Sequence, residues 1–267
     1  MLVLAGILAG FVILLSGALS TAATTQHFAV TYRILDEGLR FSVRTNARHI
    51  VAPDLSAAAL IEEGAICYSS YCAQCHDAPA GPRADHGQGM LPIPSNLAQS
   101  AREWPAEWLY YVTREGIRMT GMPAWGFRLS EHSLWATVAF LKQLPLLTRA
   151  QYLALQSAAS DDPNACPGAE TMPAYPAGER GKVTLRQYAC DSCHRIEGVV
   201  GPRSHVGPAL IDWSRRKYIA GVLPNTRENL VRWIVDPHSV SPDTLMPDLG
   251  VSEAHAGVMA DYLLGLQ

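Results

Sequence analysis

The stretch Cys72-Ala73-Gln74-Cys75-His76 decides the fold of this chain, and Cys190-Asp191-Ser192-Cys193-His194 repeats its pattern in the second half. In each copy two thiols three positions apart fall on one side of a helical turn, and a histidine follows directly. This spacing is typical of a c-type haem attachment site, where the thiols form thioethers to the porphyrin and the imidazole binds iron. The sequence therefore predicts two covalently attached haem c groups, held by Cys72, Cys75, Cys190 and Cys193.

Two other interpretations of a C-x-x-C pair compete with haem. A structural zinc site needs four thiolate or imidazole ligands, and the two motifs lie too far apart in the sequence for zinc-finger spacing. A thioredoxin-like redox pair would sit at a strand-to-helix turn within a βαβ pattern, and we find no such pattern. Haem remains the stronger prediction for both motifs.

Each attachment motif is followed by a Met-Pro pair at a similar separation. Met122-Pro123 follows His76, and Met246-Pro247 follows His194. A thioether is a soft iron ligand that raises the reduction potential relative to a second histidine, and the proline stiffens the loop that presents it. We expect His76 and Met122 to bind the first iron and His194 and Met246 to bind the second. Met119 is the rival ligand in the first half.

Both halves resemble class I (mitochondrial-type) cytochrome c domains. In the first half the stretch from Gly116 to Gly126, which contains Met122-Pro123-Ala124-Trp125, is similar to bacterial membrane-anchored cytochromes c. In the second, Tyr218-Ile219-Ala220-Gly221 and the stretch from Asn229 to Ile234 resemble cytochrome c domains associated with respiratory chains. The chain is thus similar to a dihaem c-type cytochrome.

The resemblance implies an all-α fold of two tandem domains, residues 57–147 and 180–267, joined by a Pro- and Asp-containing linker at 148–179. It also implies a proline carbonyl that accepts the Nδ1 proton of each haem histidine, and the candidates are Pro94 and Pro208. Trp125, three residues after Met122, is the expected porphyrin contact. Helices are predicted to lead into each motif, to cover residues 130–144, and to follow the caps Thr226 and Ser252.

The N-terminal segment contains a run without charge from Leu2 to Leu19, at the threshold length for a membrane span. We expect residues 1–25 to be a retained anchor, with a cleaved signal as the alternative, and residues 26–56 to form a juxtamembrane helix. That helix either lies on the membrane surface or packs on the first domain. Its arginines would favour the cytoplasm by the positive-inside rule. The resemblance instead implies haem domains on the periplasmic side of the bacterial cytoplasmic membrane, or a soluble periplasmic protein after cleavage.

Cys67 and Cys166 remain after haem attachment. A disulfide between them is plausible in an oxidising compartment, and two unpaired thiols are an equal alternative.

The net charge of −3 and the lack of a strongly basic region exclude nucleic acid as a partner. Two six-coordinate irons leave no open face for substrate. The sequence therefore predicts an electron carrier rather than an enzyme, working between a quinol-oxidising complex or dehydrogenase and an oxidase or soluble carrier. The alternatives are a dihaem peroxidase or sulfur-compound dehydrogenase with a displaceable Met, and a haem subunit of an oxidase or dehydrogenase complex.

Overall fold

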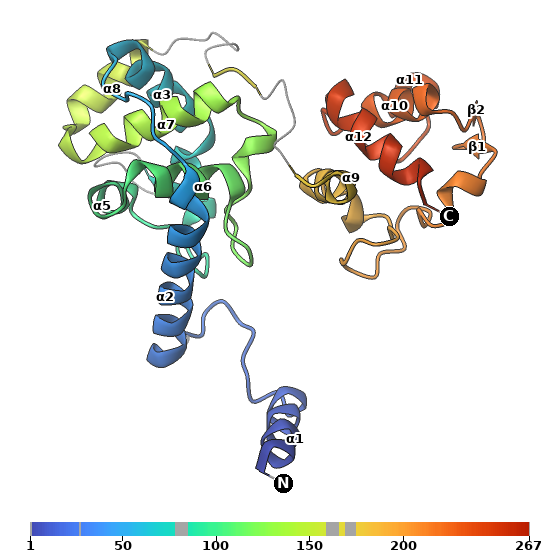
Figure 1. Cartoon of the computed structure of the whole chain (residues 1–267), viewed down its shortest axis with the longest axis horizontal. Helices are drawn as coiled ribbons and strands as arrows, with labels where there is room; N and C mark the ends of the chain where they lie inside the picture. The colour runs from blue at the N-terminus through green and yellow to red at the C-terminus, as the bar shows by residue number, and fades with distance from the viewer. Residues whose placement is uncertain (1, 27, 78–84, 159–165, 169–174, 267) are drawn as a thin grey trace. The chain divides into compact units, whose positions relative to one another are not determined.

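The computed structural model describes residues 2–26, 28–77, 85–158, 166–168 and 175–266, and these are mostly helical (Figure 1). The chain forms two compact units. Unit 1 comprises residues 1–123 and 132–166, and unit 2 comprises residues 124–131 and 167–267. Each unit contains one C-x-x-C-H motif and is described by itself.

Unit 1 is built from α-helices joined by short 3-10 turns. Its α-helices are α1 (Leu2–Leu15), α2 (Ala29–Asn46), α3 (Ala58–Tyr71), α4 (Ala73–His76), α5 (Leu97–Glu103), α6 (Ala106–Glu115), α7 (Glu131–Gln143) and α8 (Arg149–Ala158). The 3-10 turns are η1 (Ala47–His49), η2 (Asp85–Gly87) and η4 (Leu144–Leu146). Helices α3 and α7 match the helices predicted before the first motif and over residues 130–144.

The core of unit 1 forms where α3 crosses α7. A Cβ atom at Gly64 would lie 1.9 Å from the carbonyl oxygen of Ala136, so only glycine permits this approach of the two helices. One turn further along α3, the ring of Tyr68 packs against Phe140 with centroids 5.1 Å apart. Trp135, Val138 and Leu141 of α7 are all buried in this core.

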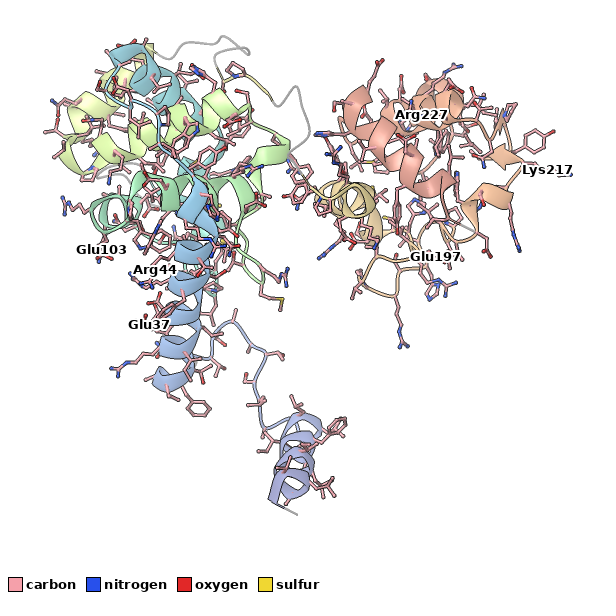
Figure 2. The ribbon with its side chains drawn as sticks, in the orientation of Figure 1. Glu37, Arg44, Glu103, Glu197, Lys217 and Arg227 are labelled. Atoms are coloured by element: carbon pink, nitrogen blue, oxygen red, sulfur yellow. A yellow bond between two sulfur atoms is a disulfide. The ribbon has the colours of Figure 1, made fainter. Side chains whose placement is uncertain are left out.

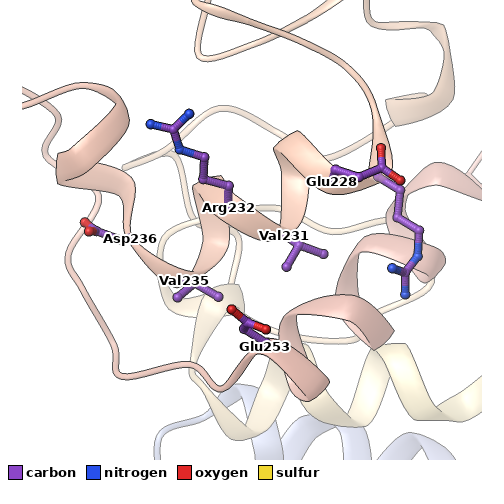
Figure 3. A pocket seen from close by; sticks show the side chains of 7 residues that line it. Glu228, Val231, Arg232, Val235, Asp236 and Glu253 are labelled. Atoms are coloured by element: carbon purple, nitrogen blue, oxygen red, sulfur yellow. The ribbon is translucent and has the colours of Figure 1, made fainter.

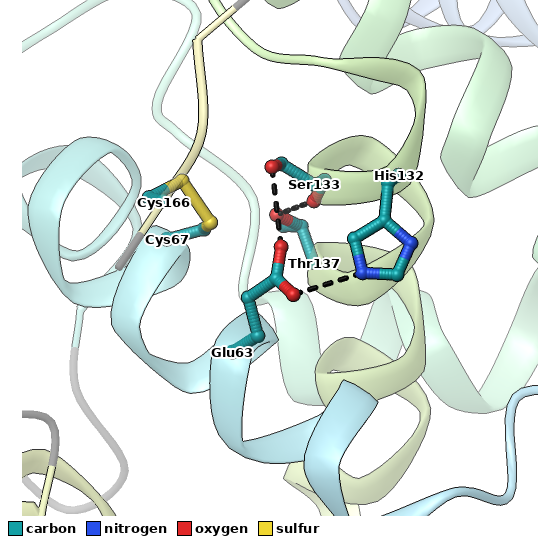
Figure 4. The surroundings of a disulfide bond; sticks show 6 residues. All are labelled: Glu63, Cys67, His132, Ser133, Thr137 and Cys166. Atoms are coloured by element: carbon teal, nitrogen blue, oxygen red, sulfur yellow. Dashed lines mark hydrogen bonds and ion pairs between the residues drawn. A yellow bond between two sulfur atoms is a disulfide. The ribbon is translucent and has the colours of Figure 1, made fainter. Parts of the chain in front are cut away.

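Cys67 and Cys166 form a disulfide with Cα atoms 5.2 Å apart, which decides between the two alternatives left open by the sequence (Figure 4). Beside it, Glu63 of α3 accepts hydrogen bonds from His132 and Ser133 of α7. The stretch 148–179 is not a linker throughout, because α8 packs on α3 and its Tyr152 is fully buried. The Pro-rich second part of this stretch dominated its composition and hid the helical first part.

Unit 2 is organised around two helices that pack against each other. Its helices are α9 (Ala177–Gln187), α10 (Arg227–Val235), α11 (Pro237–Val240) and α12 (Glu253–Leu264), with 3-10 turns η3 (Trp125–Phe127), η5 (Cys190–Ser192) and η6 (Trp213–Arg215). Both α9 and α10 pack on α12. A Cβ atom at Gly181 would lie 2.1 Å from Cβ of Tyr262, so α9 and α12 meet at a glycine as α3 and α7 do. The predicted caps are confirmed: Thr226 accepts from the N–H of Asn229, and Ser252 accepts from the N–H of His255.

The all-α prediction needs one correction in unit 2. Strands β1 (Tyr218–Ile219) and β2 (Leu223–Pro224) pair antiparallel. Ala220 and Gly221 both have positive φ in the turn between them, and Ile219 is fully buried beneath it. Strands of two residues are too short to show the alternation by which a sequence predicts a strand.

Residues 124–131 belong to unit 2, although the sequence placed them in the first domain. The backbone of this segment pairs with residues 167–168, and Arg128 donates to the carbonyl of Gln187. The ring of Phe127 stacks on Tyr175 with centroids 5.8 Å apart. This segment is therefore part of the second compact body.

The N-terminal residues form α1, which is 14 residues long and uncharged. Within the described residues, no helix combines the length and the apolar character needed to cross a membrane. The predicted juxtamembrane helix is present as α2, and its C-terminal end packs on α6.

Candidate haem-attachment sites

The first C-x-x-C-H motif begins where α3 ends. Cys72 follows the last residue of α3, and its carbonyl accepts the N–H groups of both Cys75 (3.0 Å) and His76 (2.9 Å). This single helical turn places both thiols and the imidazole on one short piece of backbone. The hydroxyl of Tyr68 donates to the carbonyl of Asp77 and so ties the end of the turn back to α3.

The second motif repeats this backbone turn. The carbonyl of Cys190 accepts the N–H groups of Cys193 (3.3 Å) and His194 (2.9 Å). Its approach differs, because α9 ends at Gln187 and Ala189 takes a left-handed conformation (φ 53°) before the motif starts. The two motifs therefore form the same turn, although the backbone before the second motif has a different conformation.

None of the four motif cysteines takes part in a disulfide. Burial raises the pKa of Cys72 to about 12 and that of Cys190 to about 11, so both stay protonated at neutral pH. Zinc binds thiolates, and within the described ranges no three His, Cys, Asp or Glu side chains come together as a metal site. The zinc interpretation therefore finds no support in the described residues. Two cysteines and a histidine on one helical turn fit thioether attachment of a porphyrin.

Each motif histidine donates Nδ1–H to a backbone carbonyl. The acceptor for His76 is Ser95 at 2.9 Å, and the acceptor for His194 is Pro208 at 2.7 Å. A carbonyl can only accept, so Nδ1 must carry the proton, and the lone pair of the neutral ring lies on Nε2. Both imidazoles are thus fixed in the tautomer that binds iron through Nε2.

Pro208 is the acceptor that the sequence predicted, whereas the prediction of Pro94 was wrong by one residue. Asn96 caps α5 by accepting the N–H of Gln99, which fixes the peptide group between Ser95 and Asn96. The carbonyl of that peptide belongs to Ser95, and it is the one that faces His76. The resemblance therefore indicated the correct segment, but it did not indicate which carbonyl of that segment accepts the Nδ1–H of His76.

Gly207 packs flat against the ring of His194, and the sequence analysis gave it no role. A Cβ atom there would lie 2.4 Å from Cε1 and 2.7 Å from Nδ1 of His194. Its N–H also donates to the carbonyl of Cys193 (2.8 Å). Gly207 and Pro208 are thus hydrogen-bonded to two neighbouring residues of the motif, Cys193 and His194. The sequence does offer a signal for this role, because Gly207 directly precedes Pro208, whose carbonyl accepts the Nδ1–H of His194.

The two Met-Pro loops share one local geometry. The N–H of Met122 donates to the hydroxyl of Thr120 (3.1 Å), and the N–H of Met246 donates to the hydroxyl of Thr244 (3.2 Å). Both methionines are half-buried, whereas the rival Met119 is 91% exposed. The structure describes each loop by itself, and ligation of iron by Met122 and Met246 stays a prediction. Trp125 lies in η3 of unit 2, and its porphyrin contact likewise stays a prediction.

A pocket on unit 2 lies between α10 and the start of α12 (Figure 3). Charged side chains of both signs line it, among them Arg232, Asp236 and Glu253. None of the predicted haem-binding residues belongs to it, so it is separate from the candidate site.

Residues 59–141, which span α3 to most of α7, match a family model described as cytochrome c oxidase, cbb3-type, subunit III. The chain contains a c-type cytochrome domain. Such a domain holds haem c covalently, and the Cys72–His76 turn lies inside the matched range.

Three curated relatives are similar to part of this cytochrome chain. Cytochrome c oxidase subunit 2 of Alkalihalophilus pseudofirmus is 31% identical over 96 residues, which cover 36% of this chain and 27% of that protein. The subunit 2 proteins of Bacillus subtilis and Bacillus sp. (strain PS3) are 30% and 28% identical, over 33% and 34% of this chain and 26% and 27% of their own lengths. The chain thus spans about a quarter of the length of the curated relatives it matches.

Proposed function

We propose that the chain is a dihaem c-type cytochrome that carries single electrons through two His/Met-ligated haems. The observation that carries this proposal is the duplicated imidazole geometry, in which His76 and His194 both donate Nδ1–H to a backbone carbonyl. One such site could be a feature of a single domain. Two, each on the same Cys-Cys-His turn, support two equivalent haem centres.

The residues of each centre have distinct roles. The cysteine pairs Cys72/Cys75 and Cys190/Cys193 would hold the haem, while His76 and His194 would bind the iron from one side. Met122 and Met246 would complete the coordination, and Pro208 and Ser95 orient the imidazoles and strengthen their donation. When bound, each haem supplies a one-electron ferric/ferrous couple.

The protein's contribution to this chemistry is positioning and exclusion. A carbonyl on Nδ1 prevents the ring from rotating, and a thioether ligand from Met122 or Met246 would favour the ferrous form of a bound haem. With both axial positions filled, neither site would admit a substrate to the iron. The proposed function is therefore electron transfer without bond chemistry, and the chain itself is not an enzyme.

We place the protein at the bacterial cytoplasmic membrane, with both haem domains on the periplasmic side and the N-terminal segment as anchor. The Cys67–Cys166 disulfide supports this location, because disulfides persist in oxidising compartments outside the cytoplasm. The proposed donor is a quinol-oxidising complex or dehydrogenase, and the proposed acceptor is an oxidase or a soluble carrier. Redox encounters of this kind use small, salt-sensitive docking patches.

A second candidate function is that of a haem subunit within an oxidase. The comparisons favour it, because the matching family model and the similar proteins are named as oxidase subunits. The electron-transfer chemistry is the same in both cases. Purification from the native membrane separates them, since a subunit co-purifies with an oxidase and a free carrier does not.

An anaerobic redox titration followed by stopped-flow mixing with peroxide tests the proposal. We expect the haem absorbance to titrate as two one-electron couples, with no reaction between the reduced or oxidised protein and hydrogen peroxide. Rapid peroxide consumption would contradict the carrier function and favour a dihaem peroxidase.

A further inference from the structure

Among the residues that the structure describes, helix α2 packs on the rest of unit 1 through its C-terminal end. Val43 and Ala47 are buried, and α2 and η1 both pack on α6. Arg40 pairs with Asp36 within α2 (3.0 Å) and with Glu103 of α5 (3.8 Å), and the second pair adds to this contact. Figure 1 shows the first turns of α2 extending beyond helices α3 to α8.

The free end of α2 carries an apolar surface that the unit does not cover. Ile34 is 67% exposed and Leu35 is 59% exposed, and Phe28, Val30 and Tyr32 are exposed as well. Tyr32 and Leu35 lie on the stripe that continues through Leu39 to the buried Val43, at helical spacing. This apolar stripe is therefore exposed to solvent near the start of α2 and buried in the core at its end.

Arginines flank this apolar surface. Residues 29–48 contain four arginines, at positions 33, 40, 44 and 48, against the two acidic residues Asp36 and Glu37. The guanidinium of Arg44 lies 5.3 Å from the ring centre of Phe41. Figure 2 shows Glu37 and Arg44 along α2, with Glu103 beside it. Long basic side chains can rest on apolar surface while their charged ends reach phosphate.

We propose that the N-terminal half of α2 lies on a phospholipid surface, with its apolar side chains among the acyl chains and Arg33 at the lipid phosphates. Helix α1 supports this choice of partner, because all its described side chains are exposed and it contains no charge. A single bilayer covers both helices at once, whereas a protein partner would have to cover two separate segments. A basic amphipathic helix is the type that binds in the plane of the membrane interface.

The consequence is that α2 fixes the first domain against the membrane. Its buried end is rigidly joined to unit 1, so contact of its other end with lipid restrains the domain instead of leaving it on a flexible tether. This inference rests on the proposed membrane location but not on the haems or on electron transfer.

Amide hydrogen exchange of the full-length chain in phospholipid nanodiscs tests the proposal. We compare the native chain with the double variant Ile34→Glu/Leu35→Glu. Glutamate forms helices at least as well as isoleucine, so lost protection in the variant reports lost lipid contact rather than lost helix propensity. The matched control is Val51→Glu, which makes the same change at an apolar residue that is 84% exposed and lies outside α2.

We expect peptides from residues 28–38 to exchange roughly tenfold faster in the double variant than in the native chain, with the control at the native rate. Equal exchange in all three chains would overturn the proposal. So would slow exchange of residues 28–38 without lipid, because that would indicate a protein contact. A chain that carries haem but does not associate with nanodiscs would refute α2 docking and the anchor together, and would leave the electron-transfer proposal standing.

Discussion

His76 and His194 each donate Nδ1–H to a backbone carbonyl, and that contact fixes which ring nitrogen can bind iron. Such bonds orient a metal ligand and raise its basicity. At the scale of single residues, the candidate sites therefore depend as much on Ser95, Pro208 and Gly207 as on the histidines themselves.

Gly207→Ala is expected to push the imidazole of His194 out of place, because the new methyl group would lie 2.4 Å from Cε1. Such overpacking costs about 1–3 kcal/mol. We expect a loss of stability of this size for unit 2 and an altered spectrum of the second haem alone. Denaturant unfolding and haem absorbance measure both. Gly178→Ala is the control, since no atom lies within 4 Å of the added methyl; an effect equal to that of Gly207→Ala would contradict the contact.

Thr120→Val and Thr244→Val are expected to loosen the Met loops, because each removes the hydroxyl that accepts the N–H of Met122 or Met246. A hydrogen bond of this kind contributes about 1 kcal/mol, or about a fivefold change in an equilibrium. Cyanide competes for the methionine position, so its affinity for the ferric haem should rise about fivefold in each valine variant. Serine variants should restore the native affinity, and valine and serine variants that behave alike would count against the role of the hydroxyl.

His255 should make unit 2 sensitive to acid. It is 2% exposed and its Nδ1 is 2.8 Å from the hydroxyl of Tyr188, while Phe127 and Arg128 also face it. Burial and the charge of Arg128 lower the pKa of His255, so the unfolded chain takes up a proton before the folded one does. Stability should therefore fall as the pH drops below about 6.5. In His255→Gln, unfolding at pH 5 and pH 8 should show a weaker dependence; an unchanged dependence would exclude His255 as its source.

The residue patterns predicted the motif side chains well and their surroundings less well. Two thiols and a histidine at fixed spacing need no tertiary information, since one helical turn brings them together. Whether the carbonyl of Pro94 or that of Ser95 accepts the hydrogen bond from His76 depends on how Asn96 caps α5. The burial of His255 depends in part on Phe127, more than a hundred residues earlier in the chain, and no local pattern reports it.

At the scale of elements, each unit places a glycine where the helix before its C-x-x-C-H motif crosses another long helix of the unit. Gly64 meets Ala136 in unit 1, and Gly181 meets Tyr262 in unit 2. The resemblance to cytochrome c domains implies such a close approach in both halves, at Gly64 and at Gly181. The sequence did not predict α8 or the short hairpin, because their signals are local and weak.

Gly64→Ala is expected to destabilise unit 1 by about 1–3 kcal/mol, because its Cβ would lie 1.9 Å from a backbone carbonyl that cannot move aside. Thermal unfolding followed by circular dichroism measures the change. Gly38→Ala in α2 is the matched control, since its methyl would meet no atom within 4 Å, and alanine favours a helix over glycine by about 1 kcal/mol. Native stability in Gly64→Ala would show that the helices do not cross so closely.

At the scale of the whole molecule, the Cys67–Cys166 disulfide joins the α3 region to the segment that leaves unit 1. The two cysteines are 99 residues apart, and the spacing alone could not pair them. What decides the pairing is the packing of α8 on α3, which brings the chain back over Cys67.

Removal of this disulfide should cost unit 1 about 4–5 kcal/mol, the chain-entropy value for a loop of about 100 residues. Cys67→Ser/Cys166→Ser is therefore expected to unfold at a much lower denaturant concentration than the native chain. A reductant should lower the native midpoint toward that of the variant and leave the variant unchanged. Equal midpoints for the native chain and the variant would contradict a stabilising disulfide.

The central claim, two irons per chain that are each held between an imidazole and a thioether, is tested most directly by counting and typing the haems of the purified full-length protein. Pyridine haemochrome analysis against protein mass gives the count, and near-infrared magnetic circular dichroism of the ferric protein identifies the axial ligands. We predict two haem c groups per chain, both low-spin with His/Met ligation. One haem per chain, or a high-spin ferric signal from either site, would contradict it.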